Sequence, residues 1–159
     1  MRILEYTRPA VEELGMQKYT LPAGTYLYHG LTAEYIDPDD FEAPLWVSTA
    51  QEVAEWFRSG RTDHLKQYKE YSSDEIDLYL FKTTQDIDLW AIYSRNELDD
   101  FSNYFDVYVA GNRYDIEEVT DVLLNLGFDG WYIPNNYSNG DDILLADIST
   151  LDFIEEIKL

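Results

Sequence analysis

Apolar side chains recur at a helical spacing in several parts of the chain. The most regular stretch is 116–126, whose apolar residues share one face, and Gly127 follows it where a helix C-cap is expected. Residues 96–105 form a second candidate helix. Residues 50–57 form a third, because their apolar residues also share one face. The faces consist of Ile116, Val119, Val122, Leu123 and Leu126 in the first stretch and of Val53, Ala54, Trp56 and Phe57 in the third.

Shorter signals extend this helical prediction. Thr49 and Glu52 have the spacing of a capping box, which favours a helix that begins at this threonine. Residues 1–18 include two apolar residues spaced by three with glutamates between them, and this pattern predicts a helical lead-in. Residues 58–71 are predicted to be a connecting segment that is mobile or helical.

The other apolar stretches are short and rich in β-branched and aromatic residues, which is typical of strands. Loops are expected where prolines, glycines and aspartates gather, at 21–24, 31–44 and 134–142. Strands and helices do not alternate regularly, so we expect an α+β fold with a largely antiparallel sheet, in a single domain over residues 1–159. The expected strands are 25–29, 45–47, 76–82, 128–133, 143–146 and 153–157, with a further apolar stretch at 88–93.

The net charge of the protein limits the classes of partner that it can bind. The chain has 32 acidic and 11 basic residues, a formal net charge of -21, and this field repels phosphate backbones and anionic lipids. We therefore expect no direct binding of nucleic acid and no membrane contact. Two roles of acidic proteins stay open: mimicry of DNA toward a basic partner, and docking onto a protein target with a basic surface.

The residue inventory also limits the possible chemistry. The chain has no cysteine and only two histidines, His29 and His64, so disulfides are excluded and we expect no metal site. No stretch approaches the roughly 18 apolar residues of a membrane span, and the N-terminus lacks the apolar run of a signal peptide. The expected location is therefore the cytoplasm.

Three short constellations could carry a reaction. Residues 28–30 read Tyr-His-Gly at the end of a predicted strand, residues 48–49 read Ser-Thr before the helix that contains Trp56, and residues 141–142 are two aspartates before an apolar strand. In this order and context, over about residues 24–148, they resemble the ADP-ribosyltransferase superfamily. The resemblance is to the branch with a His-Tyr-Glu triad, which includes diphtheria-toxin-like enzymes and poly-ADP-ribose polymerases. It implies a split antiparallel β-sheet with flanking helices.

The first motif of that family binds NAD. Its histidine hydrogen-bonds ribose hydroxyls, and its glycine backbone pairs with the nicotinamide amide. Tyr28, His29 and Gly30 match it, so the resemblance implies that they contact NAD. A glycine suits this position because a side chain would block the close approach of a flat ring to the backbone. Taken alone, the tripeptide also fits an ordinary aromatic strand with a histidine at its tip.

The second motif is an aromatic-Ser-Thr segment before a helix that carries another aromatic residue, and two aromatic rings sandwich the nicotinamide. Ser48 and Thr49 match its polar residues, and Trp56 or Phe57 falls where the helix aromatic is expected. The resemblance implies that Ser48 and Thr49 brace the NAD site and that Trp56 stacks. The same residues also fit a capped helix with core aromatics, and one residue can serve both roles.

The third motif is a catalytic glutamate at the start of a late strand. In the family it follows a strand of the form Gly-aromatic-Asp-Gly, which residues 127–130 match. Alignment of 143–145 with the apolar run of the family places Asp142 on the catalytic carboxylate. Its implied role is to hold a ribose hydroxyl and to stabilise the oxocarbenium-like charge that grows as nicotinamide leaves. Taken alone, 139–142 fits a solvated turn.

The chain departs from the family at two positions. Val47 stands where the family has a tyrosine, which forfeits stacking worth roughly 0.5 to 1.5 kcal/mol for an aromatic pair. Trp46 and the loop residue Tyr35 are candidate replacements for that ring. Asp142 stands where the family has glutamate, so its backbone would have to lie closer to the ribose.

These motifs favour a mono-ADP-ribosyltransferase with NAD as cosubstrate. It would cleave the nicotinamide-ribose bond and transfer ADP-ribose to a protein target with a basic surface, with His29 and Asp142 as the catalytic pair. Small acidic members of the family occur among phage-encoded inhibitors of bacterial defence, including an anti-CRISPR that modifies its target. The resemblance therefore implies action on a nucleic-acid-binding complex in the host cytoplasm. Toxin and housekeeping roles stay open.

Two other functions stay open beside this one. The main alternative is a non-enzymatic acidic inhibitor that blocks a basic site by charge mimicry, on a degenerate transferase fold. A third possibility is hydrolysis of NAD without transfer to a protein.

Overall fold

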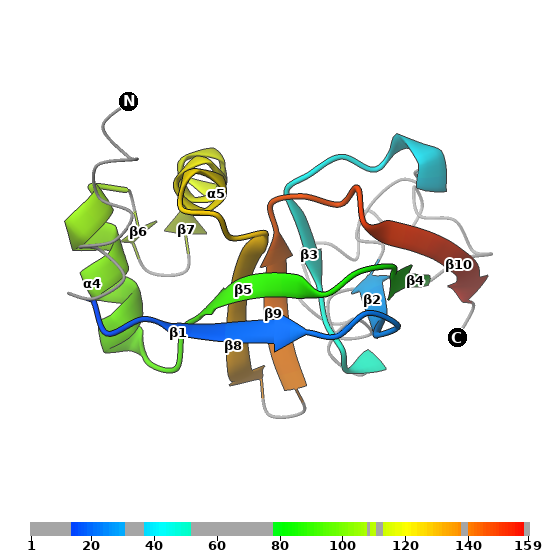
Figure 1. Cartoon of the computed structure of the whole chain (residues 1–159), viewed down its shortest axis with the longest axis horizontal. Coiled ribbons are helices and arrows are strands. Elements are labelled where there is room, and N and C mark those ends of the chain that lie inside the picture. Colours follow the sequence, from blue (N-terminus) through cyan, green and yellow to red (C-terminus); the bar gives the residue numbers. More distant parts are fainter. Residues whose placement is uncertain are drawn as a thin grey trace, which may run out of the picture.

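The computed structural model describes residues 14–30, 37–51, 78–107, 109–110, 113–137 and 140–157. These residues form an α+β structure with its strands in two larger sheets and one short ribbon (Figure 1). The helices are α4 (Arg95–Phe105), α5 (Ile116–Asn125) and the 3-10 turn η1 (Pro38–Asp40). The strands are β1 (Gln17–Leu21), β2 (Tyr26–Gly30), β3 (Leu45–Val47), β4 (Leu78–Thr83), β5 (Ile87–Ala91), β6 (Val109–Ala110), β7 (Arg113–Tyr114), β8 (Gly130–Tyr137), β9 (Gly140–Leu145) and β10 (Leu151–Ile157).

The two larger sheets have different strand orders. The five-stranded sheet runs β1-β5-β8-β9-β3, and the three-stranded sheet runs β10-β4-β2. Strands β6 and β7 form the separate ribbon. Pairing is antiparallel throughout except between β5 and β8, which are parallel. The predicted α+β class and the largely antiparallel pairing are therefore confirmed for the described residues.

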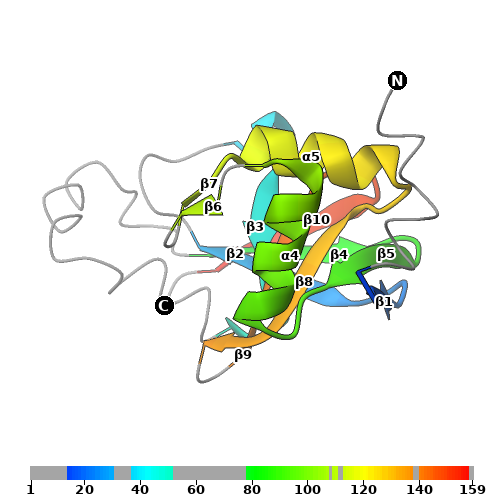
Figure 2. The same cartoon turned by 90° about the vertical axis from the view of Figure 1, so that its left-hand side faces the viewer.

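The five-stranded sheet is covered on both faces, which explains the unbroken apolar runs 89–91, 131–133 and 143–145 in its central strands β5, β8 and β9. One face packs against the three-stranded sheet in an apolar cluster that includes Leu27, Val47, Phe81, Leu89 and Ile143; we call it the inter-sheet core. The other face packs against α4 and α5 in a second cluster that includes Trp90, Phe101, Leu123, Trp131 and Leu144; we call it the helix-side core. Figure 2 views the molecule from the helical side, with α4 in front of β8.

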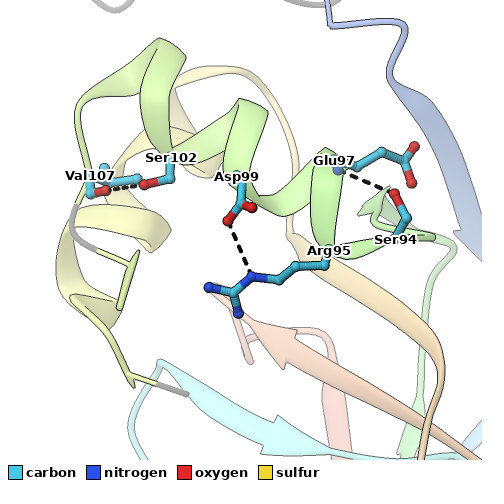
Figure 3. A network of polar contacts seen from close by, with 6 residues as sticks. All are labelled: Ser94, Arg95, Glu97, Asp99, Ser102 and Val107. Carbon is cyan, nitrogen blue, oxygen red and sulfur yellow. Dashed lines mark hydrogen bonds and ion pairs between the residues drawn. The ribbon is translucent and has the colours of Figure 1, made fainter. Parts of the chain in front are cut away.

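Both helices begin at a side-chain cap. The Ser94 hydroxyl accepts the amide of Glu97 at the start of α4, and the Asp115 carboxylate accepts the amide of Glu118 at the start of α5. Helix α4 is further held by the ion pair between Arg95 and Asp99, at 3.2 Å. After its left-handed C-cap residue, the chain is tied back by a hydrogen bond from the Ser102 hydroxyl to the Val107 carbonyl, at 2.6 Å (Figure 3).

The strand that was expected to begin at residue 128 begins later, at Gly130, where the backbones of β8 and β9 are in close contact. A Cβ placed on Gly130 would lie 1.9 Å from the carbonyl oxygen of Leu144, so only glycine fits this register. Gly127 has a φ of +89°, in agreement with its predicted place after the end of α5. The local backbone geometry therefore favours glycine at positions 127 and 130, whether or not a ligand binds nearby.

Several element boundaries differ from the sequence-based expectation. Strand β1 was not expected, because residues up to 18 were predicted to be helical; residues 1–13 lie outside the described part of the chain. The predicted loop at 134–142 was wrong, because β8 continues to Tyr137 and β9 already begins at Gly140. The predicted helix at 50–57 and the connection at 58–71 lie, apart from residues 50 and 51, outside the described residues.

The helices at 95–105 and 116–125 match the predicted stretches within one residue, and the predicted strands 45–47, 76–82 and 153–157 correspond to β3, β4 and β10. Among the described residues, no helix has both the length and the apolar character needed to cross a membrane.

Candidate functional site

The first two sequence motifs meet where the two sheets come together. Tyr28 of β2 and Ser48, just after β3, form an isolated antiparallel bridge. The Tyr28 amide donates to the Ser48 carbonyl at 2.8 Å, and the Ser48 amide donates to the Tyr28 carbonyl at 3.0 Å. This exchange links the three-stranded sheet to the edge of the five-stranded sheet, so His29 and Gly30 lie beside Ser48.

The third motif joins the same place through Asp141, the second residue of β9. Its Oδ1 accepts the Ser48 hydroxyl at 2.7 Å and the Thr49 amide at 2.9 Å, and its Oδ2 accepts the Thr49 hydroxyl at 2.7 Å. The Ser48 hydroxyl also lies 2.8 Å from the Asp141 carbonyl and accepts the amide of Ala50 at 3.0 Å. We call this set of contacts the Asp141 clamp.

Two of the three side chains in the clamp are almost completely buried. Ser48 and Asp141 expose only 2% and 7% of their surface, whereas Thr49 is exposed. Hydrogen bonds to a carboxylate are stronger than those between two neutral groups, because the acceptor carries charge. A carboxylate has about four lone-pair positions, and the clamp fills three of them. One position on Oδ2 is left for a further donor.

His29 is fixed by the backbone of β3. Its Nδ1 lies 2.7 Å from the carbonyl oxygen of Trp46, so Nδ1 carries a proton and donates it to that oxygen. Burial lowers the pKa of His29 from its ordinary value of 6.5, while the hydrogen bond to Trp46 acts in the opposite direction. The ring is therefore neutral at pH 7, and Nε2 is a hydrogen-bond acceptor.

Aromatic rings hold the His29 imidazole from the inter-sheet side. Phe41, just after η1, meets it edge to face with ring centres 5.2 Å apart, and Tyr79 of β4 lies 6.4 Å away. Phe41 also contacts Tyr79 and Phe81 in the same geometry. No hydrogen bond links His29 Nε2 to a described residue. The imidazole therefore has a fixed ring and one acceptor atom to offer a ligand.

Alternation along the strands places His29 and Asp141 on facing surfaces. Side chains two residues apart in a strand share a face, so His29 lies on the side of Leu27, and Asp141 lies on the side of Ile143. Leu27 and Ile143 belong to the same inter-sheet core. The histidine and the carboxylate thus continue the inner faces of the two sheets.

Asp142 lies on the other face of β9. It precedes Ile143 by one residue and alternates with Leu144, which packs in the helix-side core. Its cross-strand neighbour is Ile133, which also packs there. Asp142 is 6% exposed. The resemblance implied a catalytic carboxylate at Asp142, which stays a prediction; the contacts to Ser48 and Thr49 are made by its neighbour Asp141.

The structure places the other predicted residues as follows. Gly30 is buried and pairs with Leu78 at the end of β2, and Tyr28 is half-buried. Trp56 and Tyr35 lie outside the described residues. Val47, at the position of the family's tyrosine, is a buried member of the inter-sheet core. Trp46 packs in the helix-side core instead, which disfavours it as the replacement ring beside His29.

Two features of the site were missed by sequence reasoning. One is the Asp141 clamp, which could have been anticipated from a Ser-Thr pair and a carboxylate predicted to converge. The other is a pair of stacked rings, Tyr19 of β1 and Tyr132 of β8, which pack against the inter-sheet core. Tyr19 went unnoticed because its strand was not predicted.

No protein-family model matches this sequence, and searches of curated proteins and of solved structures found no match either. Within the described part of the chain, no group of three or more histidine, aspartate or glutamate side chains is arranged to hold a metal ion.

Proposed function

We propose that this protein is a mono-ADP-ribosyltransferase with an ADP-ribosyltransferase-like fold, which uses NAD as cosubstrate and modifies a protein target. The observation that supports it is the convergence of the three sequence motifs. The Tyr28 bridge brings His29 and Gly30 beside Ser48, and the clamp brings Asp141 to the same serine. A histidine with a lowered pKa, held near a serine and a carboxylate, is the kind of group that marks a candidate functional site.

Each group has a role that its observed contacts allow. The Nε2 atom of His29 accepts a hydrogen bond from a ribose hydroxyl, because Nδ1 already donates to Trp46. The remaining acceptor position on Asp141 Oδ2 takes a second ribose hydroxyl. The clamp holds the carboxylate in one orientation, and such preorganisation is a main source of electrostatic catalysis. Gly30 offers its backbone to the nicotinamide amide.

The reaction follows from these roles. The bond between ribose C1′ and the nicotinamide nitrogen breaks, and its electron pair leaves with nicotinamide. The positive charge that develops on the ribose is stabilised by the Asp141 carboxylate. A nucleophilic side chain of the target protein then bonds to C1′ and loses its proton to solvent.

Charge suggests the kind of target. The net charge of -21 favours approach to a protein with a basic surface, as nucleic-acid-binding complexes have. Inactivation of such a complex in a bacterial defence system, by a phage-encoded protein in the host cytoplasm, is the setting that we propose. Direct contact with nucleic acid is disfavoured by the same charge.

Intact mass spectrometry tests the activity. The protein is incubated with NAD and a panel of basic, nucleic-acid-binding proteins, and released nicotinamide is measured in parallel. The proposal predicts that one target gains the mass of one ADP-ribose, and that Asp141→Asn abolishes both the added mass and nicotinamide release. Nicotinamide release without a modified target would indicate NAD hydrolysis. The absence of both would contradict the proposal.

One observation favours a second function, a non-enzymatic acidic inhibitor. Three of the four acceptor positions of Asp141 are used within the protein, as in a purely structural clamp, and the chain is strongly acidic. Such a protein would block a basic site by charge alone. Its complex would weaken steeply as salt rises, whereas a covalent mark persists at high salt.

A further inference from the structure

Two tyrosines stack beside the candidate site. The rings of Tyr19 and Tyr132 have centres 4.1 Å apart and an interplanar angle of 12°. Both side chains are half-buried and pack against the inter-sheet core. The stack joins β1 and β8, which are not neighbours in the sheet, across the intervening strand β5.

Tyr132 shares a face with the Asp141 carboxylate. Tyr132 pairs with Ile143 in the ladder between β8 and β9, and paired residues point to the same side of a sheet. Asp141 lies on that side too, two residues before Ile143. Burial, and then the charge of Asp141 with smaller contributions from Tyr19 and Tyr93, raises the pKa of Tyr132 to about 12. The hydroxyl therefore keeps its proton at any physiological pH.

The Tyr132 hydroxyl is a donor that the fold leaves available. Within the described residues it makes no hydrogen bond, while its ring is held in place by Tyr19 and by the inter-sheet core. A polar group on a fixed ring loses little conformational freedom when it binds a ligand. It also complements the other two groups, since His29 Nε2 and Asp141 Oδ2 can only accept.

We propose that Tyr132 is a further substrate-contacting residue, whose hydroxyl donates a hydrogen bond to an uncharged oxygen of the dinucleotide. That oxygen belongs to a ribose hydroxyl or to the nicotinamide amide. A phosphate oxygen is disfavoured because Asp141 and the net charge of -21 repel it. This inference rests on the proposed binding of NAD.

Calorimetric titration of the full chain with NAD tests the contact. Tyr132→Phe keeps the ring and its stack but removes the hydroxyl, so it should raise the Kd for NAD about five-fold, as expected for one hydrogen bond. Tyr19→Phe is the matched control in the same stack, and Tyr26→Phe is a control at an exposed position. Both controls should bind as the unmodified protein does. Thermal unfolding confirms that all three variants fold.

Two fragments identify the oxygen. If Tyr132→Phe weakens binding of nicotinamide, the amide is the acceptor; if it weakens binding of ADP-ribose, a ribose hydroxyl is. An unchanged Kd for NAD in Tyr132→Phe, with loss of binding in Asp141→Asn, would overturn the Tyr132 contact and leave the proposed function in place. No binding of NAD by the unmodified protein would overturn both.

Discussion

The Ser48 hydroxyl donates to Oδ1 of Asp141 over 2.7 Å, although the two residues are 93 positions apart in the chain. This contact ties the end of β3 to the start of β9. Because Ser48 also pairs with Tyr28, it fixes the position of the carboxylate relative to the strand that carries His29. One buried hydroxyl thus organises the candidate site.

Removal of that hydroxyl should destabilise the fold. Ser48→Ala leaves a buried carboxylate with one donor fewer and the Ala50 amide without its acceptor, so we expect a loss of about 2 kcal/mol in the free energy of unfolding. Urea denaturation measures it. Thr84→Ala, which removes an exposed hydroxyl bonded to the Thr150 carbonyl, is the control and should cost much less. Equal losses in the two variants would show that the Ser48 hydroxyl stabilises the fold no more than an exposed hydroxyl does.

Gly130 should tolerate no side chain. Gly130→Ala forces a Cβ against the Leu144 carbonyl and should cost at least about 3 kcal/mol or prevent folding, because β8 and β9 must separate. Gly127→Ala is the control: its φ is positive, but nothing lies within 4 Å, so we expect a cost of about 1 kcal/mol. Similar unfolding midpoints for the two variants would argue against the register between β8 and β9.

His29 should titrate below its ordinary range. In a His64→Asn background the NMR signals of His29 are the only imidazole signals, and we expect their midpoint below pH 6.5. A base whose pKa is lowered by folding binds fewer protons in the folded state than in the unfolded state. Stability is therefore complete above pH 6.5 and falls as the pH drops from there toward the folded pKa. A midpoint at or above 6.5 would contradict the burial and the neutral ring.

Asp129 should have the opposite effect on the pH dependence of stability, because folding raises its pKa. Burial raises its pKa above 3.8, and the charges of Asp147 and Asp88 add to the effect, while a hydrogen bond from the Asp88 amide partly offsets it. An acid whose pKa is raised by folding loses stability as the pH rises through its folded pKa. Asp129→Asn should therefore increase the free energy of unfolding at pH 7, by about 0.5 kcal/mol or less, and the gain should vanish near pH 3.

Asp152→Asn is the control for this effect, because it removes one negative charge from an exposed position on β10. Guanidinium is unsuitable as the denaturant since it screens charge, so urea is used for both variants. If Asp129→Asn is less stable at pH 7 than Asp152→Asn, the hydrogen bond to Asp88 outweighs burial and repulsion.

The parts of the fold that were predicted from sequence are those that local pattern determines. Helix α5 has an apolar face and a glycine at its end, and both signals lie within a dozen residues. Strand β1 was missed because only Leu21 of its five residues is buried. It is a strand by virtue of its pairing with β5 and a hydrogen bond from Thr20 to Asp88, which local pattern does not reveal.

The candidate site was predicted to the level of segments and not of every residue. The meeting of residues 28–30 with 48–49 and 141–142 was expected, and the described contacts bring these segments together. The choice between Asp141 and Asp142 depended on strand register, where a shift of one residue moves a side chain to the other face of the sheet. The sequence of 139–142 also fits a turn, because the Ser48 and Thr49 partners of the Asp141 side chain are 93 and 92 positions away in the chain.

Titration of NAD into the unmodified protein, Asp141→Asn and Asp142→Asn tests whether the dinucleotide binds at the Asp141 carboxylate, with folding of each variant checked by thermal unfolding. The proposed function predicts that the unmodified protein binds NAD, that Asp141→Asn loses at least about ten-fold in affinity, and that Asp142→Asn binds within about two-fold of the unmodified protein. No binding by the unmodified protein, or a loss confined to Asp142→Asn, would contradict it.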